Sequence, residues 1–323
     1  MKLAAILLGC MLPAADRLVV PLGLDTYVPA PQDNLLRRAA VELGRELFFD
    51  KRLSRDATIS CATCHDPARA FSDDKPVAVG IRGQRVGRRS PAILNRAWGK
   101  SFFWDGRAET LEQQVLQPIL NSKEMDLSLE DLSRRLRSDA GYLARFQSTF
   151  EREPKTEDLA RALAAYVRTI LAGDSPYDRY VAGDRNALSA QQQFGLRLFR
   201  GKANCTACHL GPNLTDEGFH NTGTAYREGS FSDSGRVVIS NHEADRGAFK
   251  TPTLREAARR APYMHDGSLA TLADVIEFYD RGGRDNPFLD GEIRPLKLTA
   301  EEKQALVAFI ATLSGVIREG WPQ

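Results

Sequence analysis

The sequence contains little histidine, cysteine or methionine: five, five and four residues among 323. It also lacks an excess of one charge, because 44 basic and 42 acidic side chains leave a net charge of +2. So small a net charge gives no reason to expect nucleic acid as a partner. The 42% hydrophobic and 27% charged residues are typical of a globular protein, and the length suits two domains.

No N-terminal membrane span is expected, because the apolar residues 1–15 are fewer than the roughly 20 that a spanning helix needs. Lys2 precedes the apolar stretch, and residues 13–15 are small enough for cleavage, so residues 1–15 predict an export signal. Residues 7–10 also resemble a lipoprotein cleavage box, with lipidation of Cys10 as the minority alternative. Either way, export predicts a periplasmic location.

Four of the five cysteines lie in two motifs of one type, Cys-Ala-Thr-Cys-His at 61–65 and Cys-Thr-Ala-Cys-His at 205–209. This spacing is typical of c-type haem attachment, in which two thiols bind the porphyrin and the next histidine reaches the iron. Zinc sites or disulfides are the alternatives, but neither motif has a second ligand pair at close spacing. The sequence therefore predicts two covalently bound haem c groups, held by Cys61, Cys64, His65, Cys205, Cys208 and His209.

A short repeat precedes both motifs: residues 43–48 recur in similar form as residues 194–199. Apolar periodicity and capping residues predict helices at about 36–49, 110–120, 128–138, 141–150, 157–172, 189–200, 271–280 and 299–313. Strand signals are few. We therefore expect a mainly α fold of two tandem cytochrome c-like haem domains with long irregular loops. Residues 172–176 predict the boundary, which gives a first domain at 16–173 and a second at 174–323.

The second axial ligand of each iron decides what such a protein does. A haem with one protein ligand can bind a small molecule, whereas a haem with two mainly passes electrons. Only His220, His242 and His265 lie outside the two motifs, and none is in the first half of the chain. The first haem therefore has few candidate ligands near it in sequence, and we expect it to be open to peroxide.

Several segments together resemble the di-haem cytochrome c peroxidase and MauG family, over residues from about 44 to 283. They lie at residues 61–67, 103–107, 114–124, 205–209, 251–255 and 262–267. The resemblance implies an enzyme that reduces hydrogen peroxide at the first, peroxidatic haem, with electrons relayed through the second from a small redox protein donor. MauG-like oxidation of residues in an oxidisable protein substrate is one alternative. A non-catalytic di-haem electron-transfer cytochrome is the other.

The resemblance also implies roles around the first haem. Ile81 stands where many family peroxidases carry a histidine that caps this haem, and isoleucine cannot bind iron. Gln114, Pro118 and Glu124 match the distal-pocket positions: the amide would orient the peroxide, and the carboxylate would move a proton between its oxygens. Trp104 matches the tryptophan between the two haems. The alternatives are a solvated glutamate, a surface glutamine and a buried core tryptophan.

The second haem departs from the classical peroxidases, which carry a methionine as its sixth ligand. Tyr279 stands at that position, as in MauG-like members, and a phenolate would lower the potential where a thioether raises it. Tyr279 also falls on an apolar helix stripe and could be core, and Met264 is a rival ligand. The aromatic residue that MauG carries just before its second motif is Ala203 here.

The family also holds a calcium between its domains with an asparagine side chain and two backbone carbonyls. The carbonyl positions match Arg260 and Pro262, but Arg89 stands at the asparagine position, and a guanidinium could take the cation's place. Calcium therefore stays an open expectation. Near the second haem, His220 and His265 are expected to form hydrogen bonds rather than bind iron.

Overall fold

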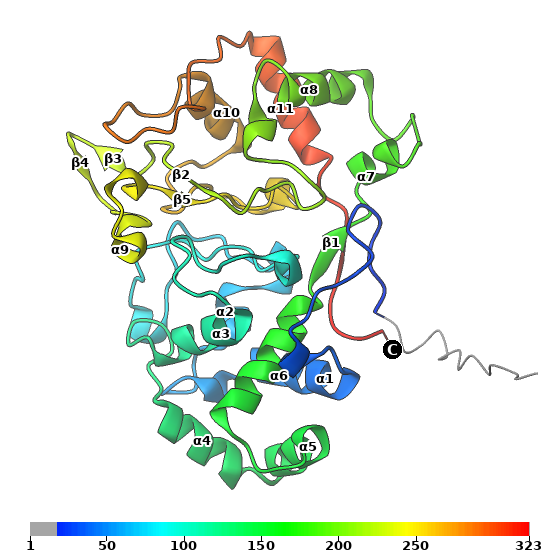
Figure 1. The fold of residues 1–323 in the computed structure, drawn as a ribbon, viewed down its shortest axis with the longest axis vertical. Coiled ribbons are helices and arrows are strands. Elements are labelled where there is room, and N and C mark those ends of the chain that lie inside the picture. The colour runs from blue at the N-terminus through cyan, green and yellow to red at the C-terminus, as the bar shows by residue number, and fades with distance from the viewer. Residues whose placement is uncertain (1–17, 323) are drawn as a thin grey trace, which may run out of the picture.

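The computed structural model describes residues 18–322, so the predicted export signal and Cys10 lie outside the described part. Helices of the first half gather at one end of an elongated molecule, and those of the second half gather at the other (Figure 1). Long loops fill the middle. The predicted mainly α fold is confirmed. Within residues 18–322, no helix combines the length and apolarity that crossing a membrane requires.

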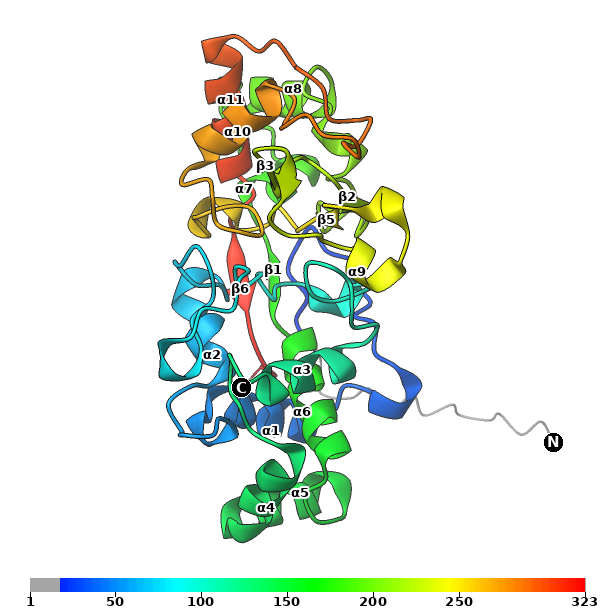
Figure 2. The ribbon, with the colours of Figure 1, turned by 90° about the vertical axis from the view of Figure 1, so that its left-hand side faces the viewer.

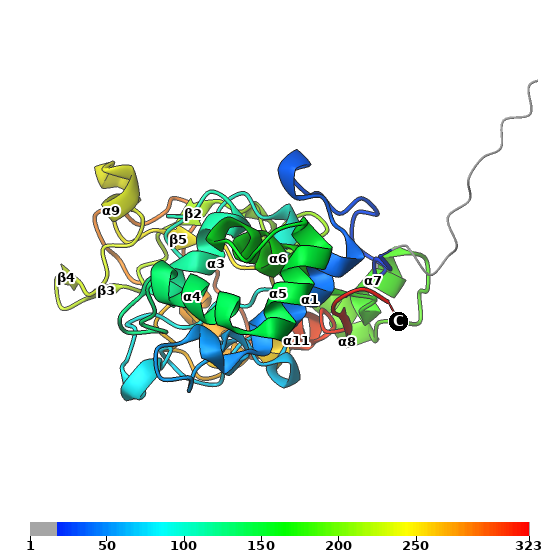
Figure 3. The ribbon, with the colours of Figure 1, turned by 90° about the horizontal axis from the view of Figure 1, so that it is seen from below.

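The first half is built on a helix pair that crosses closely. Gly44 of α1 (Arg38–Phe49) faces α6 (Thr156–Arg168), where an added Cβ would lie 1.9 Å from the Ala162 carbonyl oxygen. Seen from below, α6 lies beside α1 (Figure 3). The other helices of this half are α2 (Cys61–Cys64), α3 (Leu111–Leu120), α4 (Leu129–Ser138) and α5 (Ala140–Phe150).

The second half repeats this crossing, which explains the sequence repeat. Gly195 of α8 (Ala190–Arg200) faces α11 (Ala300–Ala311), where an added Cβ would lie 2.0 Å from the Ala305 carbonyl oxygen. Glycine is required at both positions because the two backbones leave no space for a side chain. The other helices of this half are α7 (Pro176–Val181), α9 (Val237–Ser240) and α10 (Leu272–Asp280).

We expect Gly195→Ala to destabilise the fold. The new methyl group would press on the Ala305 carbonyl and on the Phe309 Cβ, 2.8 Å away, and the two helices would have to separate. Overpacking of this kind lowers the free energy of unfolding by about 1–3 kcal/mol. Gly291→Ala is the control, since no atom lies within 4 Å of its added Cβ. Denaturant unfolding measures both; equal stability of the two variants would contradict the close crossing.

The strands are short, and one pair corrects a predicted helix. Helix α6 ends at Arg168, not at residue 172, because β1 (Leu171–Gly173) pairs antiparallel with β6 (Val316–Arg318). Figure 2 shows these two strands side by side. The remaining pairs are β2 (Phe219–His220) with β5 (Phe249–Lys250), and β3 (Tyr226–Arg227) with β4 (Ser230–Phe231).

The segment after β6 packs on the first half. The Tyr166 hydroxyl donates a hydrogen bond to the Glu319 carboxylate, which also accepts one from Arg45 Nη2 at 2.9 Å. Trp321 packs against the hydrophobic core that α1 and α6 share. The first half therefore contains residues from both ends of the described chain, and the domain division at residue 173 stays a prediction.

Candidate functional site

A cavity of about 900 Å³ lies between the loops of the first half and segments of the second. Its volume is within the range of cofactor and ligand sites. It brings together side chains that are far apart in the sequence and that the sequence analysis assigned to one site. They are Cys61, Cys64, His65, Trp104, Gln114, Pro118 and Glu124.

Reciprocal capping shapes the first motif. The Ser60 amide donates to Thr63 Oγ1 at 3.0 Å, which begins the single helical turn α2. Residues three apart in a helical turn lie on one face, so Cys61 and Cys64 can reach one porphyrin edge. Burial raises the pKa of Cys61 to about 12 and that of Cys64 to about 11. All four motif cysteines are free, which disagrees with the disulfide alternative.

The orientation of His65 suits an iron ligand. Its Nδ1 donates to the Phe71 carbonyl oxygen at 3.3 Å, so Nε2 carries no proton and is the atom left for a metal. Burial lowers the pKa of His65, which favours the neutral imidazole that metals require. The structure thus prepares His65 in the protonation state that ligation needs.

Glu124 follows α3 and borders the cavity, and a neighbour that the sequence analysis missed holds it. Asn121 Nδ2 donates to Glu124 Oε1 at 2.8 Å. Burial raises the pKa of Glu124, although this hydrogen bond and the charge of Arg107 oppose the rise. A carboxyl group with a raised pKa can exchange a proton at a pH closer to neutrality. The signal for Asn121 was its position three residues earlier, within reach in one turn.

The loop that carries Ile81 packs under Glu124. The Ile81 amide donates to the Glu124 carbonyl oxygen at 2.8 Å, and the Ile81 side chain is fully buried. An added Cβ at Gly80 would lie 2.2 Å from the Lys123 carbonyl oxygen. This loop therefore supports the distal segment and offers no iron ligand at Ile81.

Two methionines and one histidine outside the motifs also border the cavity, and two of these three residues come from the second half. They are Met125, Met264 and His265. The sequence analysis expected His265 to form hydrogen bonds, which is wrong for its ring. Its ring stacks on Phe249 with centroids 3.7 Å apart, and it forms no ring hydrogen bond within residues 18–322.

Trp104 connects the two halves of the chain. Its indole N–H donates to the Arg89 carbonyl oxygen at 2.8 Å, and its own carbonyl accepts the Lys250 amide at 2.8 Å. Its ring lies 6.5 Å from that of His265, centroid to centroid. Trp104 thus begins an aromatic series, continued by His265 and Phe249, that extends from the cavity into the second half.

The second motif repeats the arrangement of the first. His209 Nδ1 donates to the Leu214 carbonyl oxygen at 3.0 Å, and burial lowers the pKa of His209. Burial, followed by the nearby Cys208 and Cys205, raises the pKa of Tyr279 on α10. Tyr279 therefore lies beside the second motif, and its hydroxyl forms no hydrogen bond within residues 18–322. Met264 instead borders the cavity of the first motif.

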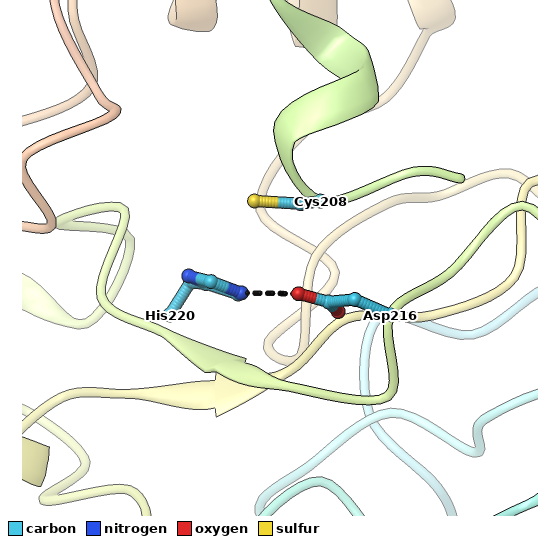
Figure 4. Close-up of side chains that lie close together, drawn as sticks. All are labelled: Cys208, Asp216 and His220. Carbon is cyan, nitrogen blue, oxygen red and sulfur yellow. Dashed lines mark hydrogen bonds and ion pairs between the residues drawn. The ribbon is translucent and has the colours of Figure 1, made fainter.

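Cys208, Asp216 and His220 lie close enough together to suggest a metal site (Figure 4). Both ring nitrogens of His220 are already bonded, Nε2 to Asp216 at 2.8 Å and Nδ1 to Asp290 at 2.6 Å. Contact with Cys208, followed by these carboxylates, raises the pKa of His220 to about 10. Because carboxylates engage both ring nitrogens, neither is free to bind zinc, and the hydrogen-bonding role expected for His220 is confirmed.

Comparison with known proteins shows to which family the chain belongs. A family model described as di-haem cytochrome c peroxidase matches residues 38–186, and one described as cytochrome c matches residues 193–314. Methylamine utilization protein MauG of Methylorubrum extorquens is 41% identical over 88% of this chain and 81% of its own. The chain belongs to the di-haem cytochrome c peroxidase family. It is therefore an oxidoreductase of the cytochrome c peroxidase type.

Other members of this di-haem peroxidase family are similar along most of their length. Cytochrome c551 peroxidase of Pseudomonas aeruginosa is 34% identical, with 85% of this chain and 78% of its own covered. A MauG-like protein associated with microbial copper homeostasis has a TM-score of 0.83 and 33% identity, over 94% of this chain and 95% of its own. The diheme peroxidase BthA from Burkholderia thailandensis has a TM-score of 0.74, 27% identity and 93% coverage of each chain.

Two cytochrome c domains imply haem c, and the residues of this family member fit it. Each motif offers two free thiols and a histidine whose Nδ1 is occupied by a backbone carbonyl. The cavity beside the first motif is large, and Tyr279 keeps an unbonded hydroxyl beside the second. A free imidazole nitrogen beside each pair of thiols is what attachment of a porphyrin iron requires, and the Tyr279 hydroxyl offers a second ligand atom for the second iron only.

The expected calcium position does not fit a cation. Arg89 Nη2 donates to the Ala261 carbonyl oxygen at 3.3 Å, between the two residues whose carbonyls were expected to bind calcium. A guanidinium bonded to the carbonyl between them brings a positive charge into this segment and repels a divalent ion. We expect chelator treatment to leave the unfolding temperature of the haem-loaded protein unchanged. Differential scanning calorimetry with and without added CaCl2 measures this, and calcium-dependent stabilisation would contradict it.

Proposed function

We propose that the chain is an exported, periplasmic peroxidase with two covalently bound haem c groups. It reduces hydrogen peroxide at the first haem and receives electrons through the second. The observation that supports this most directly is that His65, Gln114 and Glu124 border one cavity. Each hydrogen peroxide takes up two electrons and two protons and yields two water molecules.

The chain's own residues orient the peroxide and move its proton. Haem c, when bound, supplies an iron that exchanges electrons and leaves a face for a small molecule. We assign Gln114 to orient the peroxide by a hydrogen bond. We assign Glu124 to take the proton from the near oxygen and deliver it to the far one. Asn121 fixes the carboxyl group for this transfer, and Pro118 borders the cavity without offering a competing N–H donor.

The second half would deliver the electrons. His209 and Tyr279 are assigned to the two faces of the second iron, which a ligand pair closes to small molecules. A small redox protein is the proposed donor. We propose that Trp104 carries the electrons from the second half to the cavity of the first motif. Trp104 borders that cavity and is hydrogen-bonded both to Arg89 and to Lys250 of the second half.

We expect Trp104→Phe to slow electron transfer between the haems. The smaller ring loses the indole hydrogen bond to Arg89 and recedes from His265. A tenfold slower step corresponds to about 1.4 kcal/mol of additional barrier, and we expect an effect of about this size. Stopped-flow absorbance of first-haem reduction measures it. The control is Trp98→Phe, because Trp98 does not line the cavity; equal rates in both variants would exclude Trp104 as the connection.

The spin states of the two ferric haems test the proposed function. The as-isolated protein should show one high-spin and one low-spin haem by electron paramagnetic resonance. Stoichiometric hydrogen peroxide should then change the high-spin signal first. Two low-spin haems that are inert to peroxide would instead identify an electron carrier, with Met125, Met264 or His265 as the candidate sixth ligand of the first iron.

A second candidate function is the MauG-like alternative of the sequence analysis, the oxidation of residues in a partner protein. It is favoured by Tyr279, which stands where the classical peroxidases have methionine. Turnover of peroxide with a reduced small cytochrome as the only donor would support the peroxidase. Peroxide consumption that requires an oxidisable protein, and is slow with such a cytochrome, would support the second candidate.

A further inference from the structure

Two arginines at the boundary between the two halves are buried without an acidic partner. Arg89 is 5% exposed and Arg260 is 9% exposed, and both border the cavity of the first motif. Neither forms an ion pair with any carboxylate in residues 18–322. Arginine is almost never buried in this way unless it is paired.

Other buried arginines of the chain show the usual arrangement. Each of them meets a carboxylate, with the closest N–O distance between 2.6 and 2.8 Å. These pairs are Arg96 with Glu217, Arg168 with Glu112, and Arg255 with Asp178. The absence of a partner at Arg89 and Arg260 is therefore specific to the boundary and not a general property of the fold.

Within residues 18–322, the two guanidiniums donate hydrogen bonds only to neutral oxygens, and each keeps at least one N–H group without an acceptor. Arg89 donates to Asp73 O (2.6 Å), Ser72 Oγ (3.1 Å), Ala261 O (3.3 Å) and Ser90 O (3.4 Å). Arg260 donates to the carbonyls of Thr253 at 2.7 Å and Arg255 at 2.8 Å. The Nε atoms of both side chains are buried and have no hydrogen-bond partner in the part of the chain that the structure describes.

The nearest acids form no ion pair with either guanidinium within residues 18–322. Asp73 accepts from the Ser90 hydroxyl at 3.0 Å and keeps its other carboxylate oxygen unbonded among these residues, so its charge offsets the burial of Arg89 only in part. Glu256 is paired with Arg259 at 3.2 Å. Burial lowers the pKa of Arg260 to about 10, and the charge of Arg89 adds to this effect. Leaving a buried charge uncompensated is strongly destabilising, so an anion that enters the cavity must complete the site.

We propose that Arg89 and Arg260 bind the propionate carboxylates of the haem held by Cys61 and Cys64. This inference rests on the proposed attachment of haem to the first motif. A haem carries two carboxylates at one edge, and its thioether bonds fix the opposite edge. Arginine suits this ligand, because its planar fork matches a carboxylate with two parallel hydrogen bonds. The first haem would thus be held by the first half at one edge and by the domain boundary at the other.

The reduction potentials of the haem-loaded Arg89→Gln and Arg260→Gln variants test this proposal. Removing a positive charge beside the carboxylates should lower the potential of the first haem, because the reduced iron then loses a stabilising cation. The second haem should change less. Arg96→Gln is the matched control, since Arg96 lines the same cavity but is paired with Glu217.

Spectroelectrochemical titration separates the outcomes. A first-haem potential that stays at the wild-type value, or falls no further than in the control, would overturn the proposal. A shift confined to the second haem would overturn it equally. Intact-mass measurement reports haem attachment independently, so a protein without haem at Cys61 and Cys64 would refute the premise instead. If a glutamine variant does not fold, the Arg89→Lys and Arg260→Lys variants test the contact by resonance Raman spectroscopy. The band of the haem propionates should shift in these variants, and an unchanged band would contradict the contact.

Discussion

Replacing Glu124 by glutamine should slow peroxide cleavage about 10²- to 10⁴-fold, the usual contribution of a positioned acid–base group. The amide keeps the size of the carboxyl group and can still bond to Asn121, which donates to Glu124 Oε1 at 2.8 Å. It cannot accept and return a proton. Both haems should remain attached, because Glu124 does not contact the Cys-x-x-Cys-His motifs covalently.

Rapid mixing of the ferric protein with hydrogen peroxide measures this effect. Glu130→Gln is the matched control, because Glu130 is an exposed residue of the next helix, α4. Burial raises the pKa of Glu124, so the reactive carboxylate is lost as the pH falls through that raised value. The wild-type rate should therefore decline on the acid side, and the Glu124 variant should lack that decline. Unchanged peroxide kinetics would remove Glu124 from the mechanism.

Tyr279→Met should raise the reduction potential of the second haem by hundreds of millivolts. A thioether favours the reduced iron, whereas a phenolate favours the oxidised one, and axial ligands together span about 0.8 V. The position allows this exchange, because Tyr279 lies near both cysteines of the second motif and its hydroxyl forms no hydrogen bond with the described residues 18–322. Redox titration followed at the absorbance of each haem measures the change.

Tyr279→Phe is the companion variant for this prediction. It keeps the apolar ring in the stripe of α10 but supplies no ligand atom, so the second iron should become high-spin. If both variants left the spectrum and potential of the second haem as in the wild type, Tyr279 would be an ordinary core residue. That result would also remove the main support for the MauG-like function.

The haem motifs and the helix starts could be predicted because they depend on local sequence. The ligands His65 and His209 are contiguous with their cysteines. Helices α3 and α10 begin where Thr110 and Thr271 cap them, each accepting an amide N–H three residues on. Such signals need no knowledge of the rest of the chain.

The features that the sequence did not reveal all depend on distant partners. Helix α6 stops early because residues 316–318 return to pair with β1, over a hundred residues away. The place of His265 depends on its stacking with Phe249. The absence of an ion pair at Arg89 within residues 18–322 cannot be seen in the sequence, since only the packed fold shows which carboxylates come within reach of its guanidinium.

The return of the C-terminal strand affects the order in which the protein can mature. The first half completes its small sheet and the contacts of Tyr166 and Arg45 only with residues 316–319, which the ribosome adds long after residues 61–65. During synthesis, the nascent first half would therefore keep an unpaired sheet edge until these residues have been added. Residues 61–65, where we propose that haem is attached, would be exposed to other proteins before that half has closed.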